Sequence, residues 1–243
     1  MEMWREYLEQ FADREGNADA QIIVAAYHAA DLFGLLSKTL DREEKDRTLI
    51  DQRINYFRDA ARRAEIFDDC LVTATFTLYN HMNTLCRQFA SGNLESEQLI
   101  RQIEQQVQLS TKGPDQIERA AAALRAVFPL LSLMTLILDH DGTMTRTIRQ
   151  IEQRFASGAS RAATAWEHLL NALYRTVEMM QLFDLLSDPE LRDQVQQIAT
   201  EFEEDDQPPE LKLKLRNGFC RLFELGHLVT MHLDEILDPG RTG

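Results

Sequence analysis

Apolar side chains recur every three or four residues along almost the whole chain, and this spacing constrains the fold more than any other feature of the sequence. A stripe of this kind marks one face of an α-helix. The longest stripe runs from Leu211 to Ile236. With only 10 glycines and 6 prolines in 243 residues, the chain has too few turn residues for an all-β protein. The sequence therefore predicts an all-α fold, a multi-helix bundle or an irregular stack of helical hairpins, with about nine or ten helices.

Two segments interrupt the helical pattern. Over residues 71–78, Val, Ala, Phe and Leu alternate with threonines, which is typical of a strand. The helical spacing continues beyond Leu78 and the neighbouring segments are helical, so we predict a helix, with a strand as the alternative. Pro129 lies within another predicted helix, and it should kink or divide that helix because it removes a backbone hydrogen bond.

The chain is predicted to form a single helical domain over residues 1–243. If it divides into subdomains, the boundary falls near 112–115, where Gly113–Pro114 is the clearest break. Predicted helix pairs begin at uneven intervals, and no signature of a known helical repeat is present. The hexapeptide Ile-Arg-Gln-Ile-Glu-Gln occurs at 100–105 and at 148–153. We interpret this match as coincidence in a compositionally biased helical chain.

Acidic residues outnumber basic ones, 40 to 26, which gives a formal net charge of −14. We therefore expect no nucleic-acid partner, because phosphate backbones bind clustered Lys and Arg. Over half of the excess lies between Asp188 and Glu210, where nine acidic residues accompany one basic residue. This segment is interpreted as a solvated helix face and linker, as a weak divalent-cation site, or as a docking surface for a basic protein partner. The charges proposed for that docking surface are Glu203, Glu204, Asp205 and Asp206.

The sequence also favours a cytoplasmic protein. No apolar secretory segment follows Met1, and the apolar runs at 22–36 and 127–138 fall short of the ~18 uninterrupted apolar residues that a membrane span needs. The 3 cysteines form no paired spacing and are typical of a reducing compartment. We expect no membrane partner.

Two pairs of residues carry the chemistry that a site would need. His28 and Asp31 lie three residues apart in a very apolar helix, where each must find a partner to offset its burial. Such a pair either fixes the register of the helix or serves as a metal ligand, proton carrier or ligand anchor.

Glu224 and His227 have the same spacing on the last predicted helix. Two copies of this spacing, with two further glutamates, build a di-metal centre in some four-helix bundles. One copy is present here, so the pair is either half of such a centre or an ion pair near Gly226.

These features predict a non-enzymatic interaction or regulatory protein without a cofactor. It would use its helical faces and the acidic segment to bind a protein partner or a second copy of itself. The alternative is a metal- or ligand-binding helical-bundle enzyme, with a divalent metal at His28, Asp31, Glu224 and His227.

Overall fold

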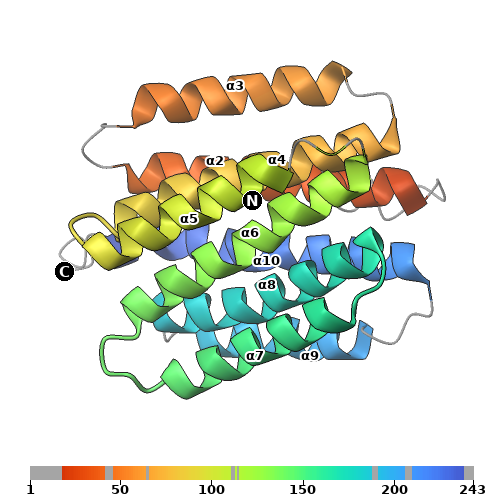
Figure 1. Cartoon of the computed structure of the whole chain (residues 1–243). Coiled ribbons are helices and arrows are strands. Elements are labelled where there is room, and N and C mark those ends of the chain that lie inside the picture. The colour runs from red at the N-terminus through yellow and green to blue at the C-terminus, as the bar shows by residue number, and fades with distance from the viewer. Residues whose placement is uncertain are drawn as a thin grey trace.

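The computed structural model describes residues 18–41, 46–63, 66–110, 113, 115–187, 191–205 and 210–237, which form nine helices and no strand (Figure 1). This confirms the predicted all-α bundle. The five longer helices are α2 (Ala18–Leu40), α4 (Phe67–Phe89), α6 (Gln116–Leu138), α8 (Ala165–Ser187) and α10 (Leu211–Leu237). The four shorter ones are α3 (Arg47–Arg63), α5 (Leu94–Ser110), α7 (Thr145–Arg161) and α9 (Arg192–Asp205).

The five longer helices pack side by side in a closed ring. Each packs against the next in chain order, and α10 packs against α2 to close the ring. Near the beginnings of α2 and α10, Arg216 donates a hydrogen bond to Gln21 over 2.9 Å. Further along, Gly226 lies against Leu32 and Phe33. The two helices that close the ring therefore run in the same direction.

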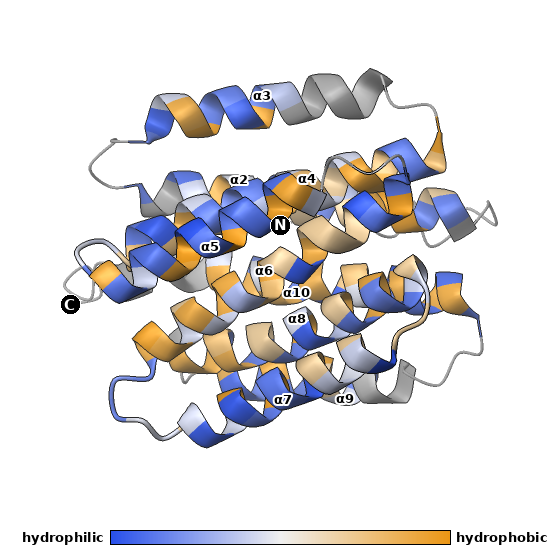
Figure 2. Ribbon diagram, in the orientation of Figure 1, coloured by the Kyte–Doolittle hydropathy of each residue, from blue (hydrophilic) through white to orange (hydrophobic). Residues whose placement is uncertain are grey.

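The shorter helices lie outside the ring, and each packs on two neighbouring ring helices. Figure 2 shows that the ring helices are the more apolar ones, whereas α3, α7 and α9 are mostly hydrophilic. A two-layer arrangement of this kind needs only a narrow apolar stripe on each outer helix. In α7, for example, Ile148 and Ile151 are buried while most of the helix remains accessible.

The hairpins are more regular than the sequence suggests. The first four ring helices begin at residues 18, 67, 116 and 165, so successive starts lie 49 residues apart, and each of these helices has 23 residues. The repeated hexapeptide has an offset of 48 residues, and its two copies lie on the outer helices α5 and α7. In both copies the two isoleucines are buried. The two copies begin at different positions within their helices, six residues into α5 and three residues into α7, so the interpretation as coincidence stays open.

Both interrupted segments are helical. Residues 71–78 belong to α4, where the hydroxyls of Thr73, Thr75 and Thr77 donate to backbone carbonyls one turn earlier. Helix α6 continues through Pro129 without division. Its N-cap is Asp115, whose carboxylate accepts hydrogen bonds from two backbone amides of the first turn. Asp115 and Gly113 are the only described residues at the predicted break near 112–115.

Two described helices are long and apolar enough to cross a membrane, α2 over Asp19–Lys38 and α6 over Gln116–Leu138. Both are ring helices that pack against two ring neighbours. Core helices of water-soluble proteins have this composition as well, so the cytoplasmic location stays a prediction.

Candidate functional site

His28 and Asp31 lie on α2, which packs against α10, and both are half-buried. The imidazole of His28 lies beside the Phe223 ring, with 5.9 Å between ring centroids. Burial lowers the pKa of His28, and the Asp31 carboxylate partly opposes that change. His28 therefore lies at the contact between two ring helices, and both interpretations of the pair stay predictions.

Glu224 and His227 lie on α10, where Glu224 accepts a hydrogen bond from Arg221 over 2.6 Å. The same guanidinium contacts Glu201 of α9 at 3.0 Å. His227 stacks on Phe223 with 6.1 Å between ring centroids, and burial lowers its pKa. The glutamate thus takes part in an ion-pair network that joins α9 to α10.

The structure brings the two histidines to the same contact, between α2 and α10, with Phe223 against both. Glu224 instead pairs with Arg221, which also contacts Glu201 of α9. Among the described residues, no three His, Cys, Asp or Glu side chains are placed to hold a metal ion. The metal site at the two pairs stays a prediction, and the described residues offer it no set of three ligands. The side chains of Glu203, Glu204, Asp205 and Asp206, on which the predicted docking surface depends, fall outside the described residues.

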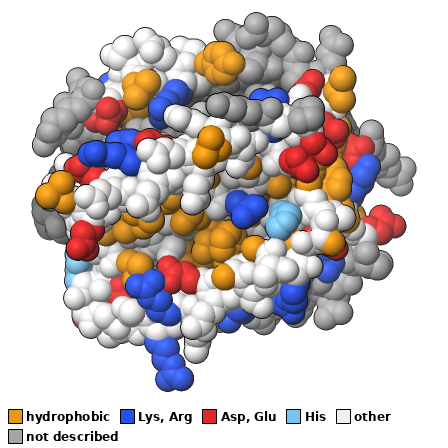
Figure 3. Space-filling view, viewed as in Figure 1, with side chains coloured by type: hydrophobic (Ala, Val, Ile, Leu, Met, Phe, Trp, Pro, Cys, Tyr) orange, Lys and Arg blue, Asp and Glu red, His pale blue; other side chains and the backbone are white. Residues whose placement is uncertain are grey.

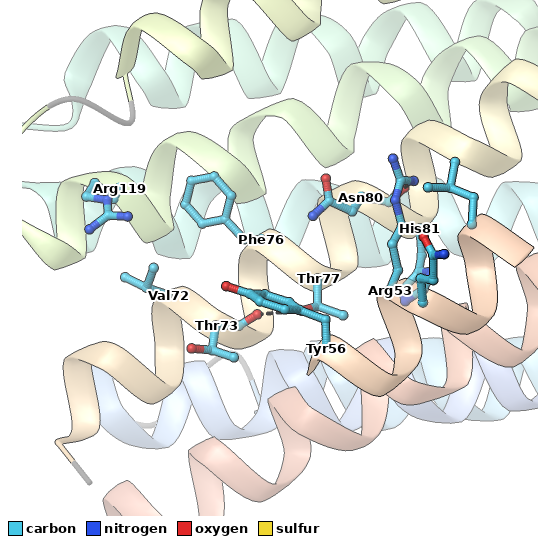
Figure 4. Close-up of a pocket in the computed structure, with 11 residues that line it drawn as sticks. Arg53, Tyr56, Val72, Thr73, Phe76, Thr77, Asn80, His81 and Arg119 are labelled. Carbon is cyan, nitrogen blue, oxygen red and sulfur yellow. Dashed lines mark hydrogen bonds between the residues drawn. The ribbon is translucent and has the colours of Figure 1, made fainter. Parts of the chain in front are cut away.

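A cleft of about 530 Å³ between α3 and α4 is the stronger candidate site (Figure 4). Arg53 and Tyr56 line it from α3, Phe76 and His81 from α4, and Arg119 from α6. The volume lies in the range of small-molecule and peptide-anchor sites. The cleft is open on one side, since Tyr56 is 72% exposed.

The two arginines lie at opposite ends of the cleft, with Tyr56 and Phe76 between them (Figure 4). Arg53 donates to the backbone carbonyl of Asn80 over 3.0 Å and also to the Thr84 hydroxyl. Burial lowers the pKa of Arg53, while Asp46 and Glu104 favour its charged form. A guanidinium remains protonated at neutral pH, so this end of the cleft is positively charged.

Arg119 places the second positive charge over the Phe76 ring, with its guanidinium carbon 6.0 Å from the ring centroid. One terminal nitrogen donates to the side-chain oxygen of Gln116 over 2.8 Å. The Nε of Arg119 is buried and has no hydrogen-bond partner. Neither Arg119 nor Arg53 forms an ion pair with any carboxylate that the structure describes.

His81 is fully buried at the cleft wall, and neither of its ring nitrogens has a hydrogen-bond partner. Burial, with a smaller contribution from the charge of Arg53, lowers the pKa of His81 to about 4. The imidazole is therefore neutral at pH 7, with one donor and one acceptor unused. Its ring packs over Gly34, where an added Cβ would lie 3.0 Å from Nε2.

Among the described residues that line the cleft, none is Asp or Glu. Sequence reasoning did not find this site, because Arg53 and Arg119 lie on different helices and meet only in the folded chain. The one available signal was His81, a histidine in an apolar stretch. No family model, curated protein or solved structure matches the chain, so the geometry of the cleft carries the functional argument.

Proposed function

We propose that the protein is a non-enzymatic interaction protein that binds an anionic group of its partner in the cleft between α3 and α4. One observation carries this proposal. In a chain of net charge −14, the cleft presents two arginines and, among its described lining residues, no acidic side chain. A half-buried guanidinium that no carboxylate contacts directly is costly, and an incoming anion would offset that cost.

The unused hydrogen-bonding groups support the same conclusion. Buried polar atoms without partners are few in folded proteins, and each needs an explanation. Here the Nε of Arg119 and both ring nitrogens of His81 are such atoms, and all three belong to residues that line the cleft. A carboxylate, sulfonate or phosphate oxygen would accept a hydrogen bond from Arg119. The aromatic rings of Tyr56 and Phe76 would contact an apolar part of the same partner.

The proposal is tested by titrating the protein with naphthalene-1,5-disulfonate, an aromatic dianion, and following the fluorescence of the probe. Replacing Arg119 with Gln should weaken binding about tenfold or more, since a charge-assisted hydrogen bond contributes about 1.5–3 kcal/mol. Binding should also weaken as salt is added.

Arg125→Gln is the matched control, because Arg125 is an exposed arginine on the same helix, α6, and does not line the cleft. This variant should bind the probe like the wild type. Equal affinity of the wild type and the Arg119→Gln variant, with both folded by circular dichroism, would contradict the proposal.

A further inference from the structure

We infer that the partner of this cleft is an acidic peptide segment of a protein, lying along α4 between the outer helices α3 and α5. The inference rests on the proposed function and adds the class of partner. It depends on three observations: the separation of the two arginines, the open side of the cleft, and the apolar side chains around it.

The separation of the charges selects an extended partner. Arg119 covers Phe76, whereas Arg53 donates to the Asn80 carbonyl and the Thr84 hydroxyl, four and eight residues further along α4, which corresponds to about 6 and 12 Å of helix. One inorganic anion cannot contact both guanidinium groups at this separation. Acidic side chains four residues apart on an extended peptide lie on the same face and about 13 Å apart, which is comparable with the spacing of the arginines.

The open side of the cleft lets a chain pass through it. A drug-sized ligand is usually enclosed over most of its surface, whereas Tyr56 beside this cleft is 72% exposed. A peptide could bind its carboxylates at the two ends, place an apolar side chain between Tyr56 and Phe76, and continue beyond the cleft on both sides.

Exposed apolar side chains supply an observation that does not depend on charge. Among the described residues, all six large apolar side chains that are exposed lie on α3, at the start of α4 or on α5, and Figure 3 views this face of the molecule. They are Leu49, Tyr56, Ile66, Leu94, Leu99 and Leu109. Helices α3 and α5 both pack on α4, which forms the floor of the cleft. Two of the six, Leu49 and Tyr56, line the cleft itself. Arginine and aromatic side chains of this kind are enriched in protein interfaces.

The chemistry of the partner follows from the sign of the charges. Nucleic acids and anionic membranes would meet the other acidic residues of this chain, which outnumber its basic ones 40 to 26. A short acidic peptide presents its charge only to the two arginines. The chain itself contains a segment of this chemistry at 198–206, Ile-Ala-Thr-Glu-Phe-Glu-Glu-Asp-Asp, which has acidic residues on both sides of a phenylalanine.

A fluorescein-labelled peptide with the sequence of residues 198–206 is therefore the probe, and fluorescence anisotropy measures its binding to the full chain. A second peptide, with Gln and Asn in place of Glu and Asp, is the uncharged control. We expect the acidic peptide to bind at least tenfold more tightly than the control peptide. Replacing Arg119 with Gln should weaken binding at least tenfold. Replacing the exposed Tyr56 with Ala should weaken it at least threefold without unfolding the protein.

Several outcomes separate this inference from the proposed function. If the disulfonate binds in an Arg119-dependent way and the acidic peptide does not bind, the peptide inference is overturned and the anion site stands. If the Arg119→Gln substitution weakens the binding of neither the disulfonate nor the peptide, both the proposed function and the inference are wrong. Equal binding of the acidic and uncharged peptides also overturns the inference. If the full chain self-associates in sedimentation and the Arg119→Gln variant does not, the result supports the inference and identifies a second copy as the acidic partner.

Discussion

Replacing His81 with Leu should remove one part of the loss of stability that the protein suffers between pH 7 and pH 4, the part due to this imidazole. His81 is fully buried, and burial lowers its pKa from the usual 6.5 to about 4. In the unfolded chain the imidazole takes up a proton as the pH falls below about 6.5, whereas in the folded protein it does so only near pH 4. Acidification over this interval therefore favours the unfolded state.

The magnitude follows from the two pKa values. The interval between 6.5 and about 4 corresponds to about 3 kcal/mol of unfolding free energy, at ~1.4 kcal/mol per pH unit. The contribution of His81 is complete above pH 6.5 and is lost as the pH falls toward 4. Leucine cannot take up the proton, so the variant should lack this dependence. A change in packing against Gly34 would shift the stability of the variant by a constant amount at every pH, and it would leave the slope unaffected.

The assay is urea denaturation of both proteins at several pH values from 4 to 7, followed by circular dichroism at 222 nm. The quantity to compare is the difference in unfolding free energy between wild type and variant at each pH. His140→Gln serves as the control, since His140 is an exposed histidine in the turn after α6. A flat difference for His81→Leu would refute the reasoning and show that the imidazole is solvated.

Two further predictions concern the core. Asp184 is fully buried, and burial raises its pKa well above 3.8, so its stabilising contribution is present below pH 4 and is lost as the pH rises toward the folded-state pKa. In urea titrations, the unfolding free energy of Asp184→Asn should rise relative to that of the wild type by about 1.4 kcal/mol per pH unit over that interval. Asp193→Asn, at an exposed position, is the control, and parallel pH profiles of Asp184→Asn and the wild type would count against this prediction. Gly218→Ala should lower the unfolding free energy by about 1–3 kcal/mol and so lower the melting temperature, because a Cβ there would lie 2.6 Å from the Leu173 side chain. Gly113→Ala, with no atom nearer than 3.8 Å, should change the melting temperature little, and equal melting of the two glycine variants would exclude the steric reason.

The helices could be predicted from the sequence because apolar periodicity is a local property. Residues 71–78 show where the local pattern is ambiguous. Alternating threonines are typical of a strand. In α4, however, the hydroxyls of Thr73 and Thr77 donate hydrogen bonds to backbone carbonyls of the same helix. Helix α4 packs against both α2 and α6, and this burial favours the helix over the strand. Predicting the closed ring would have required knowing that Gly226 packs on α2, which no local pattern records.

The candidate site was less predictable for the same reason. The sequence indicates His28 and Asp31 as a candidate pair because they lie three residues apart on one predicted helix. The two arginines of the cleft are 66 positions apart, at 53 and 119, and each resembles any charged residue of an amphipathic helix. What distinguishes them is the lack of an ion-pair partner among the described carboxylates, which only the folded chain reveals.

The contact between α10 and α2 has a consequence for how the number of hairpins can change. An open array of helical hairpins can gain or lose a unit at its end, because each unit contacts only its neighbours. Here Arg216 of α10 donates a hydrogen bond to Gln21 of α2, 195 residues away, across the contact that closes the ring, which we call the seam. Removing α10 would therefore expose both α8 and α2. Insertions in the turns between helices would leave the seam intact, whereas a duplicated or deleted hairpin would force it open. The molecule should therefore unfold as one cooperative unit, and its lineage should vary in loop length rather than in the number of hairpins.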